Sequence, residues 1–289
     1  MGTRESFAKR FESPVEHAEG DSAARLQALV SPFVLRRVKE DVVADLPEKI
    51  EDTVMAQLTG EQRKLYLANQ DRIAQQVQHR EAGEFKKDKL KVLAELTKLR
   101  QICCDPRLHY EDYKAGSAKL DTCMELVHGA LDGGHRILLF SQFTGMLDII
   151  GKRLAKEDIA FLKLTGASSK ESRAKMVAQF QAGEVPVFLI SLKAGGVGLN
   201  LTAADVVIHY DPWWNVAAQD QATDRAHRIG QQHTVTVYKL IAKDTIEERI
   251  MQMQESKRDL VNSVLGGDGI SSALFTREDV LALLGGDGH

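Results

Sequence analysis

The sequence predicts an α/β protein in which a parallel sheet flanked by helices follows a helical hairpin insertion. From Ser117 onward, short apolar runs of strand length alternate with helical patterns, and strands buried on both faces that alternate with helices are typical of a parallel sheet. Before Gly116 the pattern is helical and rich in charge. Hydrophobic residues make up 43% of the 289 residues, so the chain can bury a core.

Residues 1–116 are interpreted as a linker and a helical protrusion. The prolines in Ser31–Arg37 and Leu46-Pro47 indicate a connector. Thr59 and Gln62 have the spacing of a capping box, in which the Gln62 side chain reaches back to the backbone of Thr59. Apolar residues at helical spacing on either side of Gly83 then predict a hairpin of two long helices: Leu65, Ile73 and Val77 in the first, and Leu90, Val92, Leu93, Leu96 and Leu99 in the second.

Residues 117–265 carry the elements of the predicted sheet. Helical segments at about 117–132, 144–157 and 168–181 alternate with apolar runs, and a longer helix follows Thr245. The runs that predict strands are 136–141, 161–164, 185–191, 206–210 and 235–241. The glycines of 266–269 then predict a joint, so residues 266–289 are expected to form a C-terminal joint and a short helix.

Composition excludes several classes of protein. The net charge of −3 gives no basic excess, so any DNA contact would come from a local patch or from backbone amides at helix N-termini. Cys103, Cys104 and Cys123 show no regular spacing, which argues against a disulfide framework and a structural zinc site. No apolar run has the length of a membrane span. We expect an intracellular location, either cytoplasmic and nucleoid-associated in a bacterium or nuclear in a eukaryote.

A glycine-rich loop follows the third predicted strand, within Ser191–Thr202. Ligands of open α/β sheets bind at the carboxyl ends of the strands, and glycines allow backbone amides to approach a phosphate. A tight turn explains the same glycines, and taken alone it is the better interpretation. A dinucleotide-binding fingerprint is excluded, because Leu201 stands where the third glycine would be.

An arginine-rich segment follows the fourth predicted strand. Arg225 and Arg228 are three residues apart and Gln221 is four before Arg225, so on a helix the three share one face. Two guanidinium groups and an amide that converge in this way can grip a phosphate. The alternative is a solvated face on which Asp220 and Asp224 pair with the arginines.

The order of these segments, from Ile137 to Gln231, resembles motifs four to six of superfamily-two helicases. Asp211–Asn215 and Arg225–Gln231 resemble the Swi/Snf branch specifically, and Ser31–Arg37 with Leu46-Pro47 is similar to the linker before its second lobe. Val216 is one departure, since the branch usually has proline after the asparagine. The resemblance covers nearly the whole chain and implies a RecA-like helicase C-terminal lobe of an ATP-dependent translocase on double-stranded DNA.

The resemblance also implies roles for residues of this chain. Arg228 would be the arginine finger on the γ-phosphate of ATP, supported by Arg225. The remaining roles are nucleotide contact for Gln221, Gly196 and Gly198, and contact with the DNA backbone for Ser141, Ser191 and Lys193. Trp213 and Trp214 are expected to pack, because an aromatic pair more often fills a core or a lobe interface than it stacks on a base. Family members move nucleosomes, displace other DNA-bound proteins or recycle RNA polymerase, so DNA-bound proteins are further candidate partners.

Two motifs of the complete motor are missing from this sequence. It has no P-loop consensus, the nearest approach being Gly145–Lys152, and no Asp-Glu dipeptide for the acidic Mg²⁺ box. We therefore expect ATP and Mg²⁺ to be held mainly by an N-terminal RecA-like lobe of the same polypeptide, and this chain to be inactive as an ATPase alone. The alternative is a non-catalytic binding module built on a decayed lobe. The retained arginine pair argues against it, and an upstream P-loop lobe in the gene would decide.

Overall fold

The computed structural model describes residues 46–79, 82–195, 198–213, 216–254 and 277–285. Contacts divide the chain into two units, and the larger consists of Leu46–Gln252 with Gly269–His289. The smaller unit, Met1–Asp45 with Met253–Asp268, lies outside the described residues except for residues 253 and 254. The predicted linker motif Ser31–Arg37 therefore also lies outside them.

The larger unit contains a six-stranded sheet in the order β1-β6-β5-β2-β4-β3, and all of its pairings are parallel. The strands are β1 (Lys49–Gln57), β2 (Ile137–Ser141), β3 (Phe161–Leu164), β4 (Val187–Ser191), β5 (Val206–His209) and β6 (Val235–Lys243). Every residue of β2, β4 and β5 is buried, as expected for strands covered on both faces. The predicted α/β fold with a parallel sheet is confirmed.

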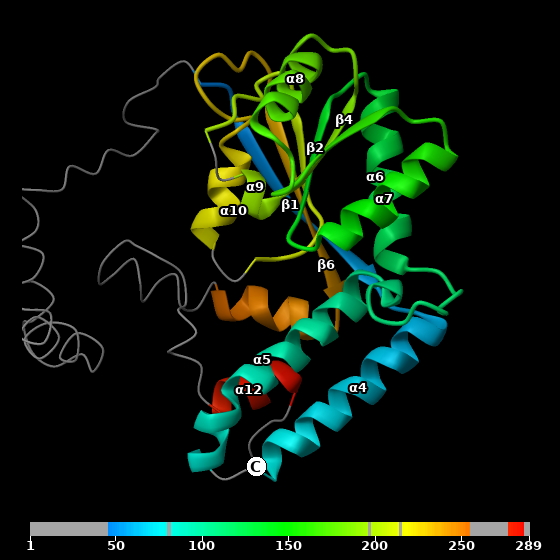
Figure 1. Ribbon diagram of the computed structural model, residues 1–289, viewed down its shortest axis with the longest axis vertical. Helices are drawn as coiled ribbons and strands as arrows, with labels where there is room; N and C mark the ends of the chain where they lie inside the picture. The colour runs from blue at the N-terminus through cyan, green and yellow to red at the C-terminus, as the bar shows by residue number, and fades with distance from the viewer. Residues whose placement is uncertain (1–45, 80–81, 196–197, 214–215, 255–276, 286–289) are drawn as a thin grey trace, which may run out of the picture. The chain divides into compact units, whose positions relative to one another are not determined.

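Helices cover both faces of the sheet (Figure 1). On one face, α6 (Ala118–Asp132) and α7 (Thr144–Lys156) pack on Ile137, Leu139 and Leu189. On the other, α8 (Lys170–Gln181), α9 (Leu192–Gly195) and α10 (Val216–Thr223) pack around Phe140 and Phe188. A further helix begins after β6 at residue 246. The core therefore consists of two apolar layers separated by the sheet.

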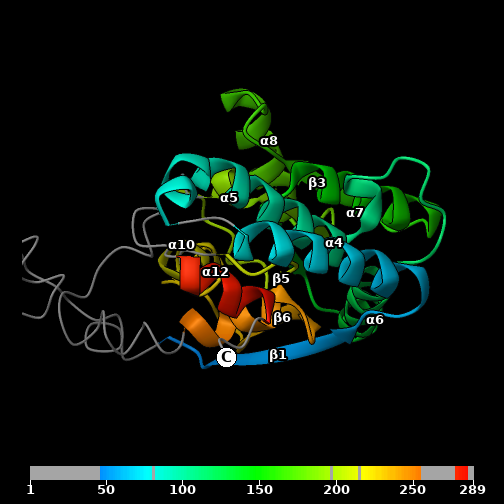
Figure 2. The same cartoon turned by 90° about the horizontal axis from the view of Figure 1, so that it is seen from below.

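The predicted helical hairpin is present as α4 (Gly60–Gln78) and α5 (Ala82–Cys104). Its contact face includes Ile73, Val77 and Leu96, which are buried, whereas Leu90 is 82% exposed. A short 3-10 helix, η4 (Pro106–Leu108), follows α5, and α12 (Arg277–Leu284) packs against α4. Figure 2 shows α4 and α5 running side by side. Within the described ranges, no helix is both long and apolar enough to cross a membrane.

Two expectations for the N-terminal region were wrong. Thr59 caps α4 without a side-chain hydrogen bond. Gln62 is instead buried and bridges two helices, because its amide nitrogen donates to the carbonyl of Ile102 at 2.9 Å and its oxygen accepts from the amide of Ala118 at 3.1 Å. A partner far along the chain outcompetes the local cap.

The second correction concerns β1, which lies in the range predicted to be linker and helical protrusion. Its residues pair with β6 along the whole strand, from Lys49 opposite Val235 to Gln57 opposite Lys243. In Figure 2, β1 is the blue strand at the lower margin, beside β6. The sheet therefore takes its edge strand from before the predicted boundary at 116, and the boundary at 265 lies outside the described residues.

Candidate functional site

The carboxyl ends of β2, β4 and β5 lie next to one another, since these strands are parallel neighbours. Ser141 and Ser191, the last residues of β2 and β4, are opposite one another in the register. The segments that follow these strands are the arginine-rich and glycine-rich segments singled out in the sequence. This edge is where open α/β sheets bind their ligands.

Ser141 and Ser191 are both buried at this edge. The Ser141 hydroxyl donates to Oδ1 of Asp211 and accepts from the backbone amide of Phe143 at 3.1 Å. The amide of Gln142 donates to the other carboxylate oxygen of Asp211 at 3.2 Å. In this structure Ser141 therefore holds Asp211 and does not present its hydroxyl to a ligand. Lys193 lies on α9, and its side chain is outside the described residues.

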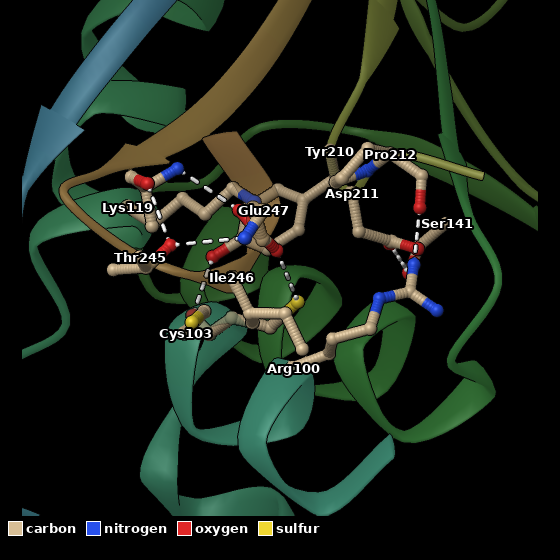
Figure 3. Close-up of polar contacts among 12 residues, drawn as sticks. Arg100, Cys103, Lys119, Ser141, Tyr210, Asp211, Pro212, Thr245, Ile246 and Glu247 are labelled. Atoms are coloured by element: carbon tan, nitrogen blue, oxygen red, sulfur yellow. Dashed lines mark hydrogen bonds and ion pairs between the residues drawn. The ribbon is translucent and has the colours of Figure 1, made fainter. Parts of the chain in front are cut away.

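Arg100 of α5 reaches across to this edge from the hairpin (Figure 3). Its guanidinium donates to the carbonyl of Pro212 and, at 3.2 Å, to the side-chain oxygen of Gln142. It also lies 5.8 Å from the ring of Phe143. Burial raises the pKa of Asp211, and the nearby Arg100 opposes that rise. The hairpin is thus attached to the start of the Asp211–Asn215 motif.

A second buried cluster lies beside Arg100. Lys119 and Glu247 form an ion pair in which both side chains are fully buried. Burial alone would lower the pKa of Lys119, but the carboxylate of Glu247 outweighs it and the pKa is raised. Glu247 also accepts from the amide of Ala242 at 2.9 Å and from the thiol of Cys104 at 3.8 Å. These partners join α5, α6, β6 and the helix that begins at residue 246.

The cysteines belong to this interior and form no disulfide. Burial raises the pKa of Cys103 and Cys104, and it raises the pKa of Cys123 to about 12. The thiols therefore stay protonated and act as packing groups.

The segment that carries the two arginines is a turn, so the predicted shared helical face was wrong. Helix α10 ends at Thr223, and residues 224–230 form consecutive turns. Gly230, with φ of 100°, lies in the left-handed region that favours glycine. We call residues 224–230 the arginine turn. Gln221 lies on α10 and is exposed.

Arg225 and Arg228 nevertheless come close together. The pKa of Arg225 is lowered, first by partial burial and second by the positive charge of Arg228. The negative charge of Asp224 opposes this lowering. Both side chains are half-buried, and Ile229 next to them is 74% exposed. The turn therefore carries two neighbouring, half-buried cations.

The arginine turn rests on the end of the glycine-rich loop. The carbonyl of Arg225 accepts from the amide of Leu201 at 3.0 Å, and Arg228 donates to the carbonyl of Leu199 at 3.5 Å. The side chain of Gln231 donates to the carbonyls of Thr202 and Ala204 at 3.2 and 2.7 Å. The two segments thus form one site.

The glycines of this loop are only partly described. Gly198 is exposed with φ of 38°, and no atom would obstruct a Cβ there. Gly196 lies outside the described residues. The structure thus brings Arg225, Arg228 and the loop around Gly198 together.

Two neighbours of the site have structural partners. The ring of His227 lies 2.7 Å from the carbonyl of Pro47, so it fixes the turn to the segment before β1. Trp213 packs against the core around Phe140, in line with its predicted role. Trp214 lies outside the described residues. No group of three or more metal-binding side chains occurs in the described part of the chain.

Two segments of the chain match known families. Residues 118–230 match the helicase conserved C-terminal domain, and residues 1–108 match the SNF2-related domain. The C-terminal domain of a Sulfolobus solfataricus SWI2/SNF2 ATPase is 31% identical with a TM-score of 0.66, over 82% of this chain and 98% of that one. A SWI2/SNF2 ATPase core of the same organism, in complex with double-stranded DNA, is 34% identical with a TM-score of 0.69, over 98% of this chain and 60% of that one.

Curated relatives come from bacteria and eukaryotes. An uncharacterized ATP-dependent helicase of Mycoplasma pneumoniae is 38% identical over 98% of this chain and 27% of its own length. The mouse chromodomain-helicase-DNA-binding protein 1-like is 38% identical over 91% of this chain and 30% of its own length. The chain therefore spans less than a third of the length of these relatives.

The parallel sheet and the segments at its carboxyl edge define a RecA-like C-terminal domain of the helicase type. More specifically, the chain belongs to the SWI2/SNF2 family of helicase-like ATPases.

Proposed function

We propose that this chain is the C-terminal lobe of an ATP-dependent translocase on double-stranded DNA, and that its arginine turn acts on ATP held by a P-loop lobe of the same polypeptide. The relatives named as ATP-dependent helicases support the use of ATP. The related SWI2/SNF2 core solved with double-stranded DNA supports the nucleic-acid partner. Because the P-loop and the acidic box are missing from this sequence, the lobe alone is inactive.

The observation that carries the proposal is the closeness of Arg225 and Arg228. Burial and then the positive charge of Arg228 lower the pKa of Arg225, which indicates that the two guanidinium groups are neighbours. An anion between or above them removes that repulsion, and planar guanidinium groups match the oxygens of a phosphate. The triphosphate of ATP therefore fits this pair.

The fit between the arginine pair and the triphosphate of ATP gives each residue of the site a role in our proposal. Arg228 donates to the γ-phosphate oxygens and stabilises the charge that develops on the transferred phosphoryl group. Arg225 and Gln221 support it, and the backbone of the glycine-rich loop at Gly196 and Gly198 completes the contact with the nucleotide. The described residues offer no cluster of metal ligands. Our proposal assigns Mg²⁺ to the preceding lobe.

DNA contacts at Ser141, Ser191 and Lys193 remain part of the proposal, with one condition. Ser141 would have to release Asp211 before its hydroxyl could reach a DNA phosphate, because that hydroxyl is buried in this structure. We expect binding that ignores base sequence and weakens as salt rises, since phosphate contacts release counterions. DNA-bound proteins, including RNA polymerase, are the candidate cargo.

The test is Arg228→Ala in the full-length protein, with ATP binding and hydrolysis measured separately. We expect kcat to fall by about 10³-fold or more, while the Kd for ATP changes little, because a finger acts on transition-state charge. Arg228→Lys should restore little activity, since an ammonium cannot make the planar contact. Arg63→Ala, an exposed arginine of α4, is the control and should keep wild-type kcat. A loss confined to ATP affinity would make Arg228 a binding residue and overturn the assignment.

A further inference from the structure

His209, the last residue of β5, has an unusual environment. Its ring is buried and stacks on Phe140 of β2, with centroids 5.5 Å apart and planes inclined by 21°. Nε2 lies 2.8 Å from the hydroxyl of Thr223. Nδ1 has no hydrogen-bond partner among the described residues. A buried polar atom without a partner is rare and calls for an explanation.

Packing alone does not explain a histidine at this position. A phenylalanine could stack on Phe140 without burying an unpaired nitrogen. The ring is also uncharged, because burial lowers the pKa of His209 to about 3. What the imidazole adds over an apolar ring is the hydrogen bond between Nε2 and the hydroxyl of Thr223.

Thr223 is the point from which the arginine turn departs. It is the last residue of α10, and its carbonyl accepts from the amides of Ala226 and His227 at 3.0 and 3.1 Å. Its side chain is held by His209 while its backbone starts the turn that carries Arg225 and Arg228. The hydrogen bond thus connects the carboxyl end of β5 to the base of the turn.

We propose that His209 is a positioning residue for ATP hydrolysis, which fixes the start of the arginine turn through Thr223 and so directs Arg228 at the nucleotide. This inference rests on the proposed function. The turn also contacts α10, the glycine-rich loop and Pro47. The hydrogen bond between His209 and Thr223 connects the start of the turn directly to a strand of the sheet. Binding groups on a sheet edge hold their geometry better than groups on loops alone.

A positioning role of His209 can be distinguished from a purely structural role, because the two roles predict different effects of substitutions on stability. In His209→Phe the stack on Phe140 is kept and the unpaired nitrogen is removed, so the fold should be as stable as wild type or more stable. Thr223→Val keeps the shape of the side chain and loses only the hydroxyl. If the hydrogen bond positions the turn, both variants lose activity, His209→Phe without losing stability and Thr223→Val with only the loss of stability that the newly unpaired Nε2 causes.

The experiment measures kcat, the Kd for ATP and Tm for both variants in the full-length protein. We expect kcat to fall about tenfold or more in both variants, because small misplacements of a reacting group are costly, with Kd for ATP unchanged. Tm should be unchanged or raised in His209→Phe and lowered in Thr223→Val, which leaves Nε2 unpaired. The double variant should be no slower than the slower single variant, since both remove one interaction. Thr223→Ser should restore kcat, and Thr97→Val on the exposed face of α5 should have no effect.

The possible results distinguish between the role of His209 and the proposed function. Wild-type kcat in both variants, with Arg228→Ala still inactive, would overturn the role of His209 and leave the proposed function standing. A parallel fall of Tm and kcat that Thr223→Ser fails to repair would show a structural role only. Hydrolysis that survives Arg228→Ala would reject the proposed function itself.

Discussion

Two groups of charged residues in this lobe are built in opposite ways. In the buried network, Lys119 faces Glu247 and Arg100 lies near Asp211, so opposite charges meet in the interior. In the arginine turn, two like charges are neighbours on a half-exposed segment. The first arrangement buries its charges in opposite-sign contacts within the lobe, while the second places two like charges together near the surface.

The comparison teaches which group determines architecture and which determines chemistry. The network joins the hairpin, the sheet and the helix that begins at residue 246 through side chains with no exposure to solvent. Replacing one of its charges should change stability more than turnover by folded molecules. Replacing a charge of the arginine turn should do the reverse.

The largest effect on stability is expected from Lys119→Met. The variant leaves Glu247 buried without its cation, and removing one partner of a buried pair costs about 3–5 kcal/mol. The combined variant Lys119→Met with Glu247→Gln should recover much of this loss, since glutamine can still accept from the amide of Ala242. Urea denaturation measures both. Equal stability of wild type and Lys119→Met would contradict the assignment of this group to architecture.

The ATPase activity of Lys119→Met also tests the contrast between the buried network and the arginine turn. Under conditions where Lys119→Met remains folded in the full-length protein, kcat for ATP should stay within a few fold of wild type. A loss of turnover as large as that of Arg228→Ala, without unfolding, would remove the distinction between the two groups.

The fold was more accessible from the sequence than these networks were. Wholly buried strands such as Ile137–Ser141 stand out as apolar runs, and the helix expected at about 117–132 is α6. Strand β1 was missed because an edge strand is half-solvated. Lys49–Gln57 is charged and mostly exposed, and its partner β6 is far along the chain.

The site was predicted by residue type and only partly by geometry. Arg225 and Arg228 do come together, but through a turn that ends with Gly230 and not through a helical face. The role of Ser141 could not be foreseen, since its partner Asp211 follows a different strand. Lys119 and Arg100 look like ordinary solvated charges of amphipathic helices, and only the packing of α5 and α6 on the lobe shows that they are buried.

A smaller effect is expected from pH, and it concerns the base of the arginine turn. Burial first, with Lys239 and Lys49 adding and Glu51 opposing, lowers the pKa of His209 from 6.5 to about 3. Between these values the unfolded chain binds a proton that the folded chain does not. The contribution of His209 to stability is therefore lost as pH falls below 6.5, by about 1.4 kcal/mol per pH unit.

Urea denaturation of wild type and His209→Phe at pH 7.5 and 5.5 tests this sign. The wild type should lose more stability than the variant on going to pH 5.5, because phenylalanine has no proton to bind. Identical pH dependence of the two proteins would mean that His209 is not held neutral in the folded state.

The central claim is that this lobe supplies the arginines and another lobe supplies the ATP site. The most direct measurement is phosphate release from ATP by the isolated 289-residue chain, with and without duplex DNA, beside the full-length protein. The account predicts hydrolysis no faster than background for the isolated chain in both conditions, and DNA-stimulated hydrolysis by the full-length protein that Arg228→Ala abolishes. DNA-stimulated turnover by the isolated chain that persists through rigorous purification would contradict it.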